Sequence, residues 1–229
     1  MFCKIEEYKA NGYCLIKNAI SSDMIEKLIQ EVVPLNSELS NYGVRNLLRK
    51  MPYLKEFVSS YAIRNIIDPI VGKDAIPVRA IFFDKIPGAN WNVAWHQDTT
   101  IAVEKKVEIE GYGPWSEKEG VVHVEPPESI LSSMVTVRVH LDATDSSNGV
   151  LRIIPGSHLK GRIKSSEILS LVESSPIVEC TSKPGDILIM NPLLVHSSRK
   201  SVRPSNRRII HVEFSSSVLP PEIQWREHD

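Results

Sequence analysis

Hydrophobic residues follow a helical spacing in the first third of the chain and a strand-like spacing in the remainder. Apolar side chains between Ile25 and Val32 recur every three or four residues, which predicts an amphipathic helix. Ser21 is placed to cap the first turn of this helix, and Pro34 closes it. Residues 47–70 predict two more short helices.

The two short helices are expected to separate near Pro52 and to end at Pro69 and Gly72. In the remainder of the chain, short apolar runs alternate with Gly, Pro, Ser and Asn, which predicts strands joined by turns. Helices followed by strands indicate an α+β fold, mainly β, with a barrel or sandwich core. We therefore expect residues 1–75 to be mostly helical support and residues 76–216 to form a β-barrel core.

Two histidines and an aspartate form a candidate metal site. His96 and Asp98 are two residues apart, so in an extended strand both side chains project to one face while Gln97 points away. With His196, one hundred residues later, they provide two imidazoles and one carboxylate, the ligand set of non-haem ferrous iron. The His-x-Asp triplet alone is a weak signal in a chain with seven histidines, and a structural histidine beside a solvated aspartate is the alternative.

The second half of the chain strengthens the metal hypothesis. Residues 183–186 form a turn signal, and the apolar run that follows leads through a proline break to His196. Residues 203–206 predict another turn, and residues 207–214 predict the next strand. This hairpin would bring Arg207 near His196, where a guanidinium could bind a carboxylate of an organic co-substrate in bidentate fashion.

Several motifs share the order and spacing of one oxygenase family. They are Phe82-Phe83-Asp84-Lys85, Asn90-Trp91, Trp95-His96-Gln97-Asp98, Arg138-Val139-His140-Leu141-Asp142, Asn148-Gly149-Val150-Leu151-Arg152-Ile153-Ile154-Pro155-Gly156-Ser157-His158, Pro184-Gly185-Asp186, His196 and Arg207. In these motifs the chain resembles the phytanoyl-CoA dioxygenase-like family of Fe(II)- and 2-oxoglutarate-dependent oxygenases, from about residue 78 to residue 214.

The resemblance implies a fold and a metal site. The fold is a double-stranded β-helix, a jelly-roll or cupin-like barrel, with N-terminal helices packed on one sheet. The implied iron ligands, which are also the catalytic residues, are His96, Asp98 and His196. A single domain would span residues 1–229.

The resemblance also implies residues that bind 2-oxoglutarate. Arg207 would bind its distal carboxylate and Ser198 would assist, while Arg45 lies roughly where some members place a basic residue that touches the co-substrate. A solvated arginine at a helix start is the alternative for Arg45. The residues at alternate positions after Arg208 are apolar, whereas those at alternate positions after Arg207 are more polar. If the inner face of the barrel were the more apolar one, Arg208 would point inward in place of Arg207.

The implied activity is hydroxylation of a C–H bond in a small organic or acyl substrate, with O2 as co-substrate and succinate and CO2 as co-products. Asp98 favours hydroxylation, because related halogenases lack a carboxylate at that position. Two alternatives remain. One is a cupin-like metalloprotein that uses the same ligands without 2-oxoglutarate, and the other is a catalytically inactive binding barrel.

Residues 101–131 form a long segment between two predicted strands, directly after the proposed ligands. Tyr112 and Trp115 lie within it, and a long loop with aromatic residues at this place is a candidate active-site lid. A solvated surface excursion is the alternative. Arg138 and Arg152 are further candidates, either for binding an anion inside the barrel or for structural ion pairs.

Composition excludes several other classes of protein. The formal net charge is −1, which provides no field for nucleic acid, and no stretch approaches the roughly 20 apolar residues of a membrane span. The first residues lack the basic flank and apolar core of a signal peptide. Cys3, Cys14 and Cys180 are widely scattered without zinc spacing, which favours reduced thiols and a cytoplasmic location.

Overall fold

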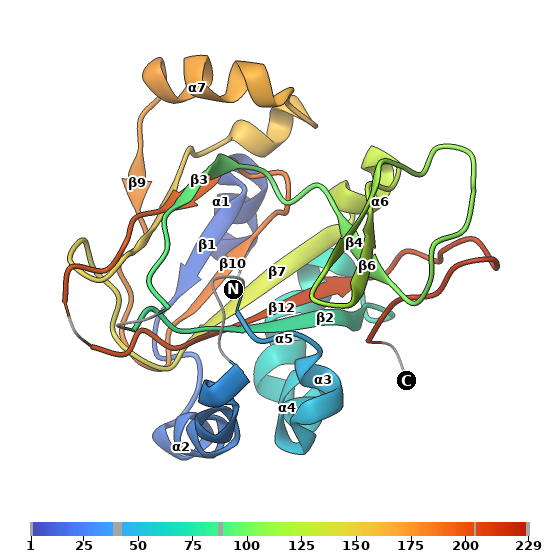
Figure 1. Cartoon of the computed structure of the whole chain (residues 1–229). Helices are drawn as coiled ribbons and strands as arrows, with labels where there is room; N and C mark the ends of the chain where they lie inside the picture. The colour runs from blue at the N-terminus through green and yellow to red at the C-terminus, as the bar shows by residue number, and fades with distance from the viewer. Residues whose placement is uncertain (1, 39–42, 87–88, 204, 228–229) are drawn as a thin grey trace.

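The computed structural model describes residues 2–38, 43–86, 89–203 and 205–227 as a mixed α/β fold, mainly β, in which paired strands are antiparallel (Figure 1). A five-stranded sheet has the order β1 (Tyr13–Ile16), β10 (Ile187–Met190), β7 (Met134–His140), β12 (Ile209–Ser215) and β2 (Ile76–Phe83). A four-stranded sheet has the order β3 (Val93–His96), β11 (His196–Ser198), β8 (Leu151–Ile153) and β9 (Val178–Glu179). A three-stranded sheet has the order β4 (Ile101–Val103), β6 (Val121–Val124) and β5 (Trp115–Lys118).

Most of the helices lie in the N-terminal third of the chain, and three shorter or later ones follow within the described residues. The helices are α1 (Phe2–Asn11), α2 (Ser22–Val32), the 3-10 helix η1 (Val33–Glu38), α3 (Leu47–Lys50), α4 (Pro52–Ser59), α5 (Tyr61–Val71), α6 (Glu128–Ser132), the 3-10 helix η2 (Ser157–Lys160) and α7 (Ser165–Glu173). Within the described residues, none of the helices has the length and apolar character that crossing a membrane requires.

Helix α2 agrees with its prediction, and the side chain of Ser21 accepts a hydrogen bond from the amide of Met24. The prediction that this helix ends before Pro34 is confirmed, because α2 ends at Val32 and Pro34 lies in the first turn of η1, where a missing N–H costs little. The expected helix end at Gly72 is also confirmed, but Pro69 does not end its helix and lies inside α5, two residues before its end. Residues 47–71 form three helices instead of two. Neither α1 nor α7 was predicted from the sequence.

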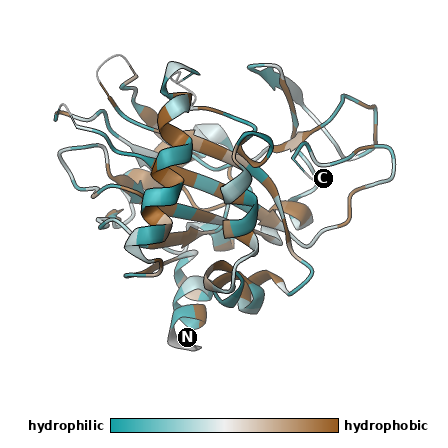
Figure 2. Ribbon diagram, turned by 90° about the horizontal axis from the view of Figure 1, so that it is seen from below, coloured by the Kyte–Doolittle hydropathy of each residue, from teal (hydrophilic) through white to brown (hydrophobic). Residues whose placement is uncertain are grey.

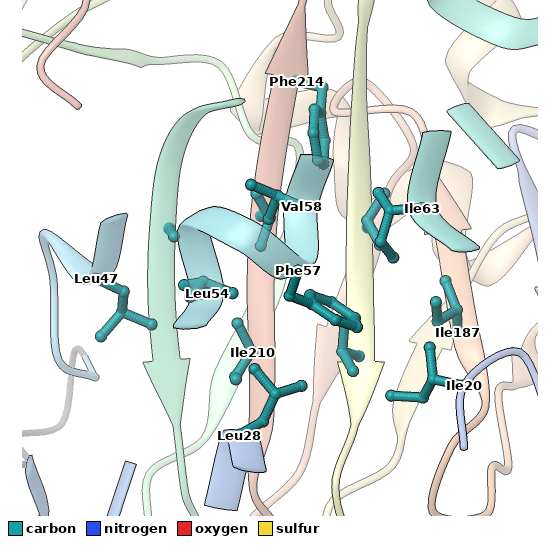
Figure 3. Packing of buried hydrophobic residues seen from close by; sticks show 14 of the residues in the cluster. Ile20, Leu28, Leu47, Leu54, Phe57, Val58, Ile63, Ile187, Ile210 and Phe214 are labelled. Atoms are coloured by element: carbon teal, nitrogen blue, oxygen red, sulfur yellow. The ribbon is translucent and has the colours of Figure 1, made fainter. Parts of the chain in front are cut away.

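The main hydrophobic core lies between α2–α5 and one face of the five-stranded sheet. Figure 2, viewed from the side of these helices, shows hydrophobic and hydrophilic residues alternating along them. Figure 3 shows Phe57 of α4 directed toward the strands, with Ile210 of β12 and Ile187 of β10 nearby. On β12, the side chains that face the helices are those of Ile210, Val212 and Phe214, all buried.

The opposite face of the same sheet is polar. On β12 it carries His211 and Glu213, which pair in register with Arg138 and Thr136 of β7. This face meets the four-stranded sheet, and Figure 1 shows α7 on the far side of that second sheet. The fold therefore directs its apolar sheet face to the helices and encloses a polar interior.

Residues 101–131 are not one continuous loop, which corrects the prediction for this segment. They contain β4, β5, β6 and most of α6, while residues 104–114 between β4 and β5 form no helix or strand. Tyr112 and Trp115 pack partly buried against an apolar cluster. Glu119 and Gly120 join β5 to β6 with positive φ values of 52° and 73°, as a tight hairpin turn requires. The apolar residues of β4 and β6 supply the burial that stabilises this sheet.

The packing predicts a large effect of truncating Phe57, whose side chain is 2% exposed within the main core. Replacement by alanine should lower the free energy of unfolding by about 3 to 5 kcal/mol, because a cavity is left behind. Urea denaturation measures the change. Tyr61→Ala is the control, since Tyr61 is 82% exposed and should change stability by less than about 0.5 kcal/mol. Equal losses in the two variants would contradict this packing.

Candidate metal centre

Antiparallel pairing brings the two predicted histidine ligands together. Strand β11 places His196 directly opposite His96 of β3, and the two ring centroids are 4.2 Å apart. Asp98 follows β3, and its carboxylate oxygens lie 3.6 Å from Nε2 of each histidine. One ligand atom from each of the three residues lies within 4.8 Å of the others. Such a group can hold a metal ion.

The backbone fixes which nitrogen each histidine offers. Nδ1 of His96 lies 2.9 Å from the carbonyl oxygen of Ala94, and Nδ1 of His196 lies 2.8 Å from that of Leu194. A carbonyl accepts only, so each Nδ1 carries the proton and donates it. Each Nε2 therefore presents a lone pair toward Asp98, and a backbone bond at the other ring nitrogen is the usual support of a metal-binding histidine.

The electrostatics of the three residues fit a cation. Burial raises the pKa of Asp98, but His196 and His96 outweigh that effect and hold it well below its ordinary value. Burial, with the neighbouring His96, lowers the pKa of His196 to about 3. Burial also lowers the pKa of His96, yet its hydrogen bond to Asp98 and that carboxylate's charge raise it overall. An ionised carboxylate and a neutral imidazole thus face the same point, and a bound cation would displace the proton that Asp98 attracts to Nε2 of His96.

Gln97 locks the strand end that carries the ligands. Its amide nitrogen donates to the carbonyl oxygens of Leu193 at 2.6 Å and Gly161 at 2.8 Å, and its oxygen accepts from the amide of Ile163 at 2.8 Å. The amide of Asp98 donates to the carbonyl of Pro192. The turn before His196 is thereby tied to the His96 strand, and Gln97 points away from the metal site.

A cavity of about 90 Å³ adjoins the three ligands, large enough for several waters or a small ligand. Its lining consists of Phe83, Lys85, Trp91, Val93, His96, Asp98, Arg138, Leu151, His196, Ser197, Ser198, Arg207 and His211. Arg207 is only 2% exposed, and its Nε and Nη1 have no hydrogen-bond partner within the described residues. A buried guanidinium with unused donors is costly unless an acceptor binds to it.

Three cationic side chains converge on this cavity. Burial, together with the charges of Arg207 and Arg138, lowers the pKa of Lys85 to about 7. Burial and the charge of Arg138 lower the pKa of Arg207 to about 9, and burial lowers that of Arg138 to about 10. The charged forms of these side chains are thus destabilised by burial and by neighbouring positive charges. A doubly charged organic anion bound in the cavity would stabilise them.

Hydrogen bonds hold these cations in place. Nζ of Lys85 donates to Oγ of Ser198 at 2.9 Å and to the carbonyl oxygen of Trp91 at 2.9 Å. Asp84 accepts from the backbone amide of Arg207 at 2.6 Å and from the side chain of Asn206 at 2.7 Å. The Phe82-Phe83-Asp84-Lys85 motif therefore positions both Arg207 and Ser198.

Arg207 and Arg208 point to opposite faces of their strand. Arg208 forms a bidentate ion pair with Asp142, with distances of 2.8 Å from both Nε and Nη2 to the carboxylate. Arg207 shares the polar inner face with His211 and lines the cavity. The apolar face of β12 packs under the helices, which is why the more polar face is the inner one.

The structure does not bring Arg45 to this cavity. Nε of Arg45 lies 3.5 Å from the carboxylate of Glu119 in the β5–β6 hairpin. The guanidinium of Arg152 lies 4.9 Å from the ring centroid of Trp95, also away from the cavity. Sequence reasoning did not single out His211 as a site residue, although its position two residues before Glu213 on the polar face is a visible signal.

A model of the phytanoyl-CoA dioxygenase family matches residues 8–209 of the chain. The chain belongs to this family. The resemblance found in the sequence motifs is therefore confirmed. A sequence search of curated proteins found no match.

Solved structures of similar fold share this architecture at low sequence identity. The non-haem alpha-ketoglutarate-dependent carbocyclase SnoK from nogalamycin biosynthesis is 16% identical, with a TM-score of 0.73 over 99% of this chain and 87% of that one. EctD from S. alaskensis, solved with 2-oxoglutarate and 5-hydroxyectoine, is 15% identical, with a TM-score of 0.72 over 94% and 76%. HygX from Streptomyces hygroscopicus, solved with nickel and 2-oxoglutarate, is 15% identical, with a TM-score of 0.68 over 94% and 86%.

The ligand geometry predicts that Asp98→Ala lowers the affinity for Mn(II) by at least about tenfold, because only two protein ligands remain. Calorimetric titration of Mn(II) at neutral pH measures the affinity. Asp145→Ala is the matched control, since Asp145 forms a surface ion pair with Arg203 and should leave the affinity unchanged. Equal Mn(II) affinities in Asp98→Ala and the parent protein would place the ion elsewhere.

Proposed function

We propose that the chain is an Fe(II)- and 2-oxoglutarate-dependent dioxygenase that hydroxylates a C–H bond of a small organic or acyl substrate. The observation that carries the proposal is the buried Arg207 guanidinium, which has unused donors in a cavity that also contains the His96, Asp98 and His196 ligand atoms. Family membership supports it, as do similar folds solved with nickel or iron and with 2-oxoglutarate.

The proposal extends to the architecture. We propose that the five- and four-stranded sheets form the two halves of a double-stranded β-helix and that residues 1–229 form one domain. The polar interior between the two sheets supports this proposal, because that interior contains the candidate site. Residues 101–131 would close over the site as the predicted lid, with the three-stranded sheet as their ordered part.

The residues of the chain have distinct roles in this proposal. His96, Asp98 and His196 would hold Fe(II), and this ligand set would leave room for co-substrate and O2. With 2-oxoglutarate bound, the metal would supply oxidation of the C–H bond by O2, with succinate and CO2 as co-products. Arg207 binds the distal carboxylate of 2-oxoglutarate, and Ser198, oriented by Lys85, adds a hydroxyl to the same end.

Hydroxylation is the outcome that Asp98 favours, because a third protein ligand occupies the position that a halide would need. Two structures of similar fold are described as a carbocyclase and an epimerase, so the scaffold also supports other oxidative outcomes. The placement of the substrate C–H bond relative to the metal then decides the product.

The decisive experiment is an anaerobic titration of the protein with Fe(II) and 2-oxoglutarate. We expect a weak absorption band in the green as the chelate forms, and succinate release once oxygen and substrate are added. Arg207→Met should weaken 2-oxoglutarate binding by about tenfold or more, whereas Arg208→Met should leave it unchanged because Arg208 is paired with Asp142. Binding affinity is measured from the band.

Each alternative has its own outcome in this titration. Bound Fe(II) without the green band, with activity unaffected in Arg207→Met, would favour a metalloenzyme that does not use 2-oxoglutarate. Failure to bind either Fe(II) or Mn(II) would favour a non-catalytic binding barrel.

The low pKa of Lys85, about 7, predicts proton uptake when 2-oxoglutarate binds to the metal-loaded protein at pH 8. Lys85 is mostly neutral at that pH, and a nearby dianion raises its pKa, so binding draws a proton from the buffer. Calorimetry in two buffers of different ionisation enthalpy measures the uptake. Lys85→Met should abolish it, and proton release in the parent protein would contradict the assignment.

A further inference from the structure

A second set of polar side chains lies on the inner face of the five-stranded sheet, beyond the metal ligands. Along β12 the inner residues run from His211, which lines the cavity, to Glu213. Glu213 pairs in register with Arg79 of β2 on one side and with Thr136 of β7 on the other. This row lies at the opposite end of β12 from Arg207, roughly 20 Å along the strand from it.

Hydrogen bonds connect the row to the cavity. Nη1 of Arg138 donates to Nδ1 of His211 at 3.0 Å, so Nε2 of that histidine carries the proton. This Nε2 lies 3.4 Å from Oε1 of Glu213, and Nη1 of Arg79 donates to the same oxygen at 3.1 Å. The row is therefore joined by hydrogen bonds to Arg138 and His211, which line the cavity.

The β5–β6 hairpin adds more polar groups at this place. The tip of the hairpin is held by the ion pair between Glu119 and Arg45. Next to it, burial and the charges of Arg79 and Arg45 lower the pKa of Lys118, while the charge of Asp98 partly offsets them. Burial and the same two arginines lower the pKa of His123 to about 3, so this imidazole is neutral.

Several buried polar atoms of this region have no hydrogen-bond partner within the described residues. They are Nη1 of Arg45, Nε2 of His123 and Oγ1 of Thr136, whereas Nε of Arg45 lies 3.5 Å from the carboxylate of Glu119. Nδ1 of His123 donates to the carbonyl of Val121, so its Nε2 is an acceptor, whereas Nη1 of Arg45 is a donor. Buried groups without partners are rare in folded proteins and point to a bound molecule that satisfies them.

The charges of the region leave an excess of positive charge. The three cations are Arg45, Arg79 and Lys118, which we call the distal cation cluster, and their carboxylate partners are Glu119 and Glu213. Burial raises the pKa of the nearby Glu227 carboxyl to about 7, so this group is only partly ionised near neutral pH. Lys118 is exposed, so the cluster is open to solvent at one end.

We propose that the distal cation cluster binds an anionic group of the substrate, a carboxylate or a phosphate, on the side of the metal ligands away from Arg207. The class of substrate is therefore a small organic acid or phosphate ester. Binding at this cluster holds a C–H bond of the substrate near the metal, while 2-oxoglutarate occupies the Arg207 cavity. This inference rests on the proposed function, because it assigns the substrate half of the same site.

The test uses calorimetry on the Mn(II)-loaded protein saturated with 2-oxoglutarate, so that the Arg207 cavity is filled. The probes are hexanoate, its neutral counterpart hexanamide, and inorganic phosphate. We expect hexanoate or phosphate to bind at least about tenfold more tightly than hexanamide, and the binding to weaken with added salt. Hexanoate and phosphate together distinguish a carboxylate from a phosphate ester as the preferred anion.

Variants locate the binding. Lys118→Met should lower the affinity for the preferred anion by about three- to tenfold, and Lys118→Glu should lower it further. Neither variant should change the affinity for 2-oxoglutarate. Lys105→Met is the matched control, because Lys105 is an exposed lysine in the same segment outside the cluster. Arg79→Lys retains the charge beside Glu213 and should bind the anion more tightly than Arg79→Met.

The outcomes separate this inference from the function on which it rests. Failure of the parent protein to bind 2-oxoglutarate overturns the proposed function. Normal 2-oxoglutarate binding, with neither anion preferred over hexanamide, overturns the distal cluster alone. Anion binding that Lys118→Met and Lys118→Glu leave unchanged also overturns it, because the anion then binds elsewhere.

Discussion

The antiparallel pairing of β3 with β11 is the interaction on which the rest of the site depends. It places His96 opposite His196, two residues that are one hundred positions apart in the chain, with Asp98 between their Nε2 atoms. Gln97 bonds to both sides of this junction and so fixes it. Metal ligands that are held by backbone pairing need little rearrangement when a cation binds, and this preorganisation is what catalysis requires.

One face of the five-stranded sheet stabilises the fold, and the other lines the candidate site. The helices bury its apolar face, and that burial supplies the stability that the polar interior does not. Arg207, Arg138 and Lys85 are cations held away from water, each with a pKa lowered by burial. The free energy gained by burying the hydrophobic core thus offsets the cost of burying the cations that make the cavity complementary to an anion. Arg79 on the same face, with Arg45 and Lys118 close to it, adds further positive charge beyond His211.

Much of the site could be predicted from the sequence, because the spacing of neighbouring residues determines which strand face they share. The i, i+2 spacing of His96 and Asp98 specifies one strand face, and the alternation after Arg207 indicates which arginine shares the polar face. If the inner face of the sheet is the polar one, Arg207 and not Arg208 points into the cavity. The inner face is polar because helices cover the other face, which carries Val212 and its apolar neighbours. Ser198 and the ligands came from the family resemblance, and the structure brings them to one cavity.

Other features depend on contacts that no local pattern records. The strands of residues 101–131 are short and form a sheet through burial with Trp225, more than ninety residues later. Lys85 becomes a site residue only because folding places its Nζ beside Ser198. Arg45 was expected near the co-substrate, but the hairpin residue Glu119 binds it at the other end of the interior. Helix α5 continues for two residues past Pro69 although Pro69 cannot donate to the carbonyl of Asn65, and the amide of Gly72 donates to Asp68 at its end.

A crystal structure of the anaerobic complex with Fe(II) and 2-oxoglutarate tests the central claim most directly. The account predicts one iron coordinated by Nε2 of His96, Nε2 of His196 and the carboxylate of Asp98, with the distal carboxylate of 2-oxoglutarate on Arg207. Iron bound by any other set of side chains, or 2-oxoglutarate bound away from Arg207, would contradict it.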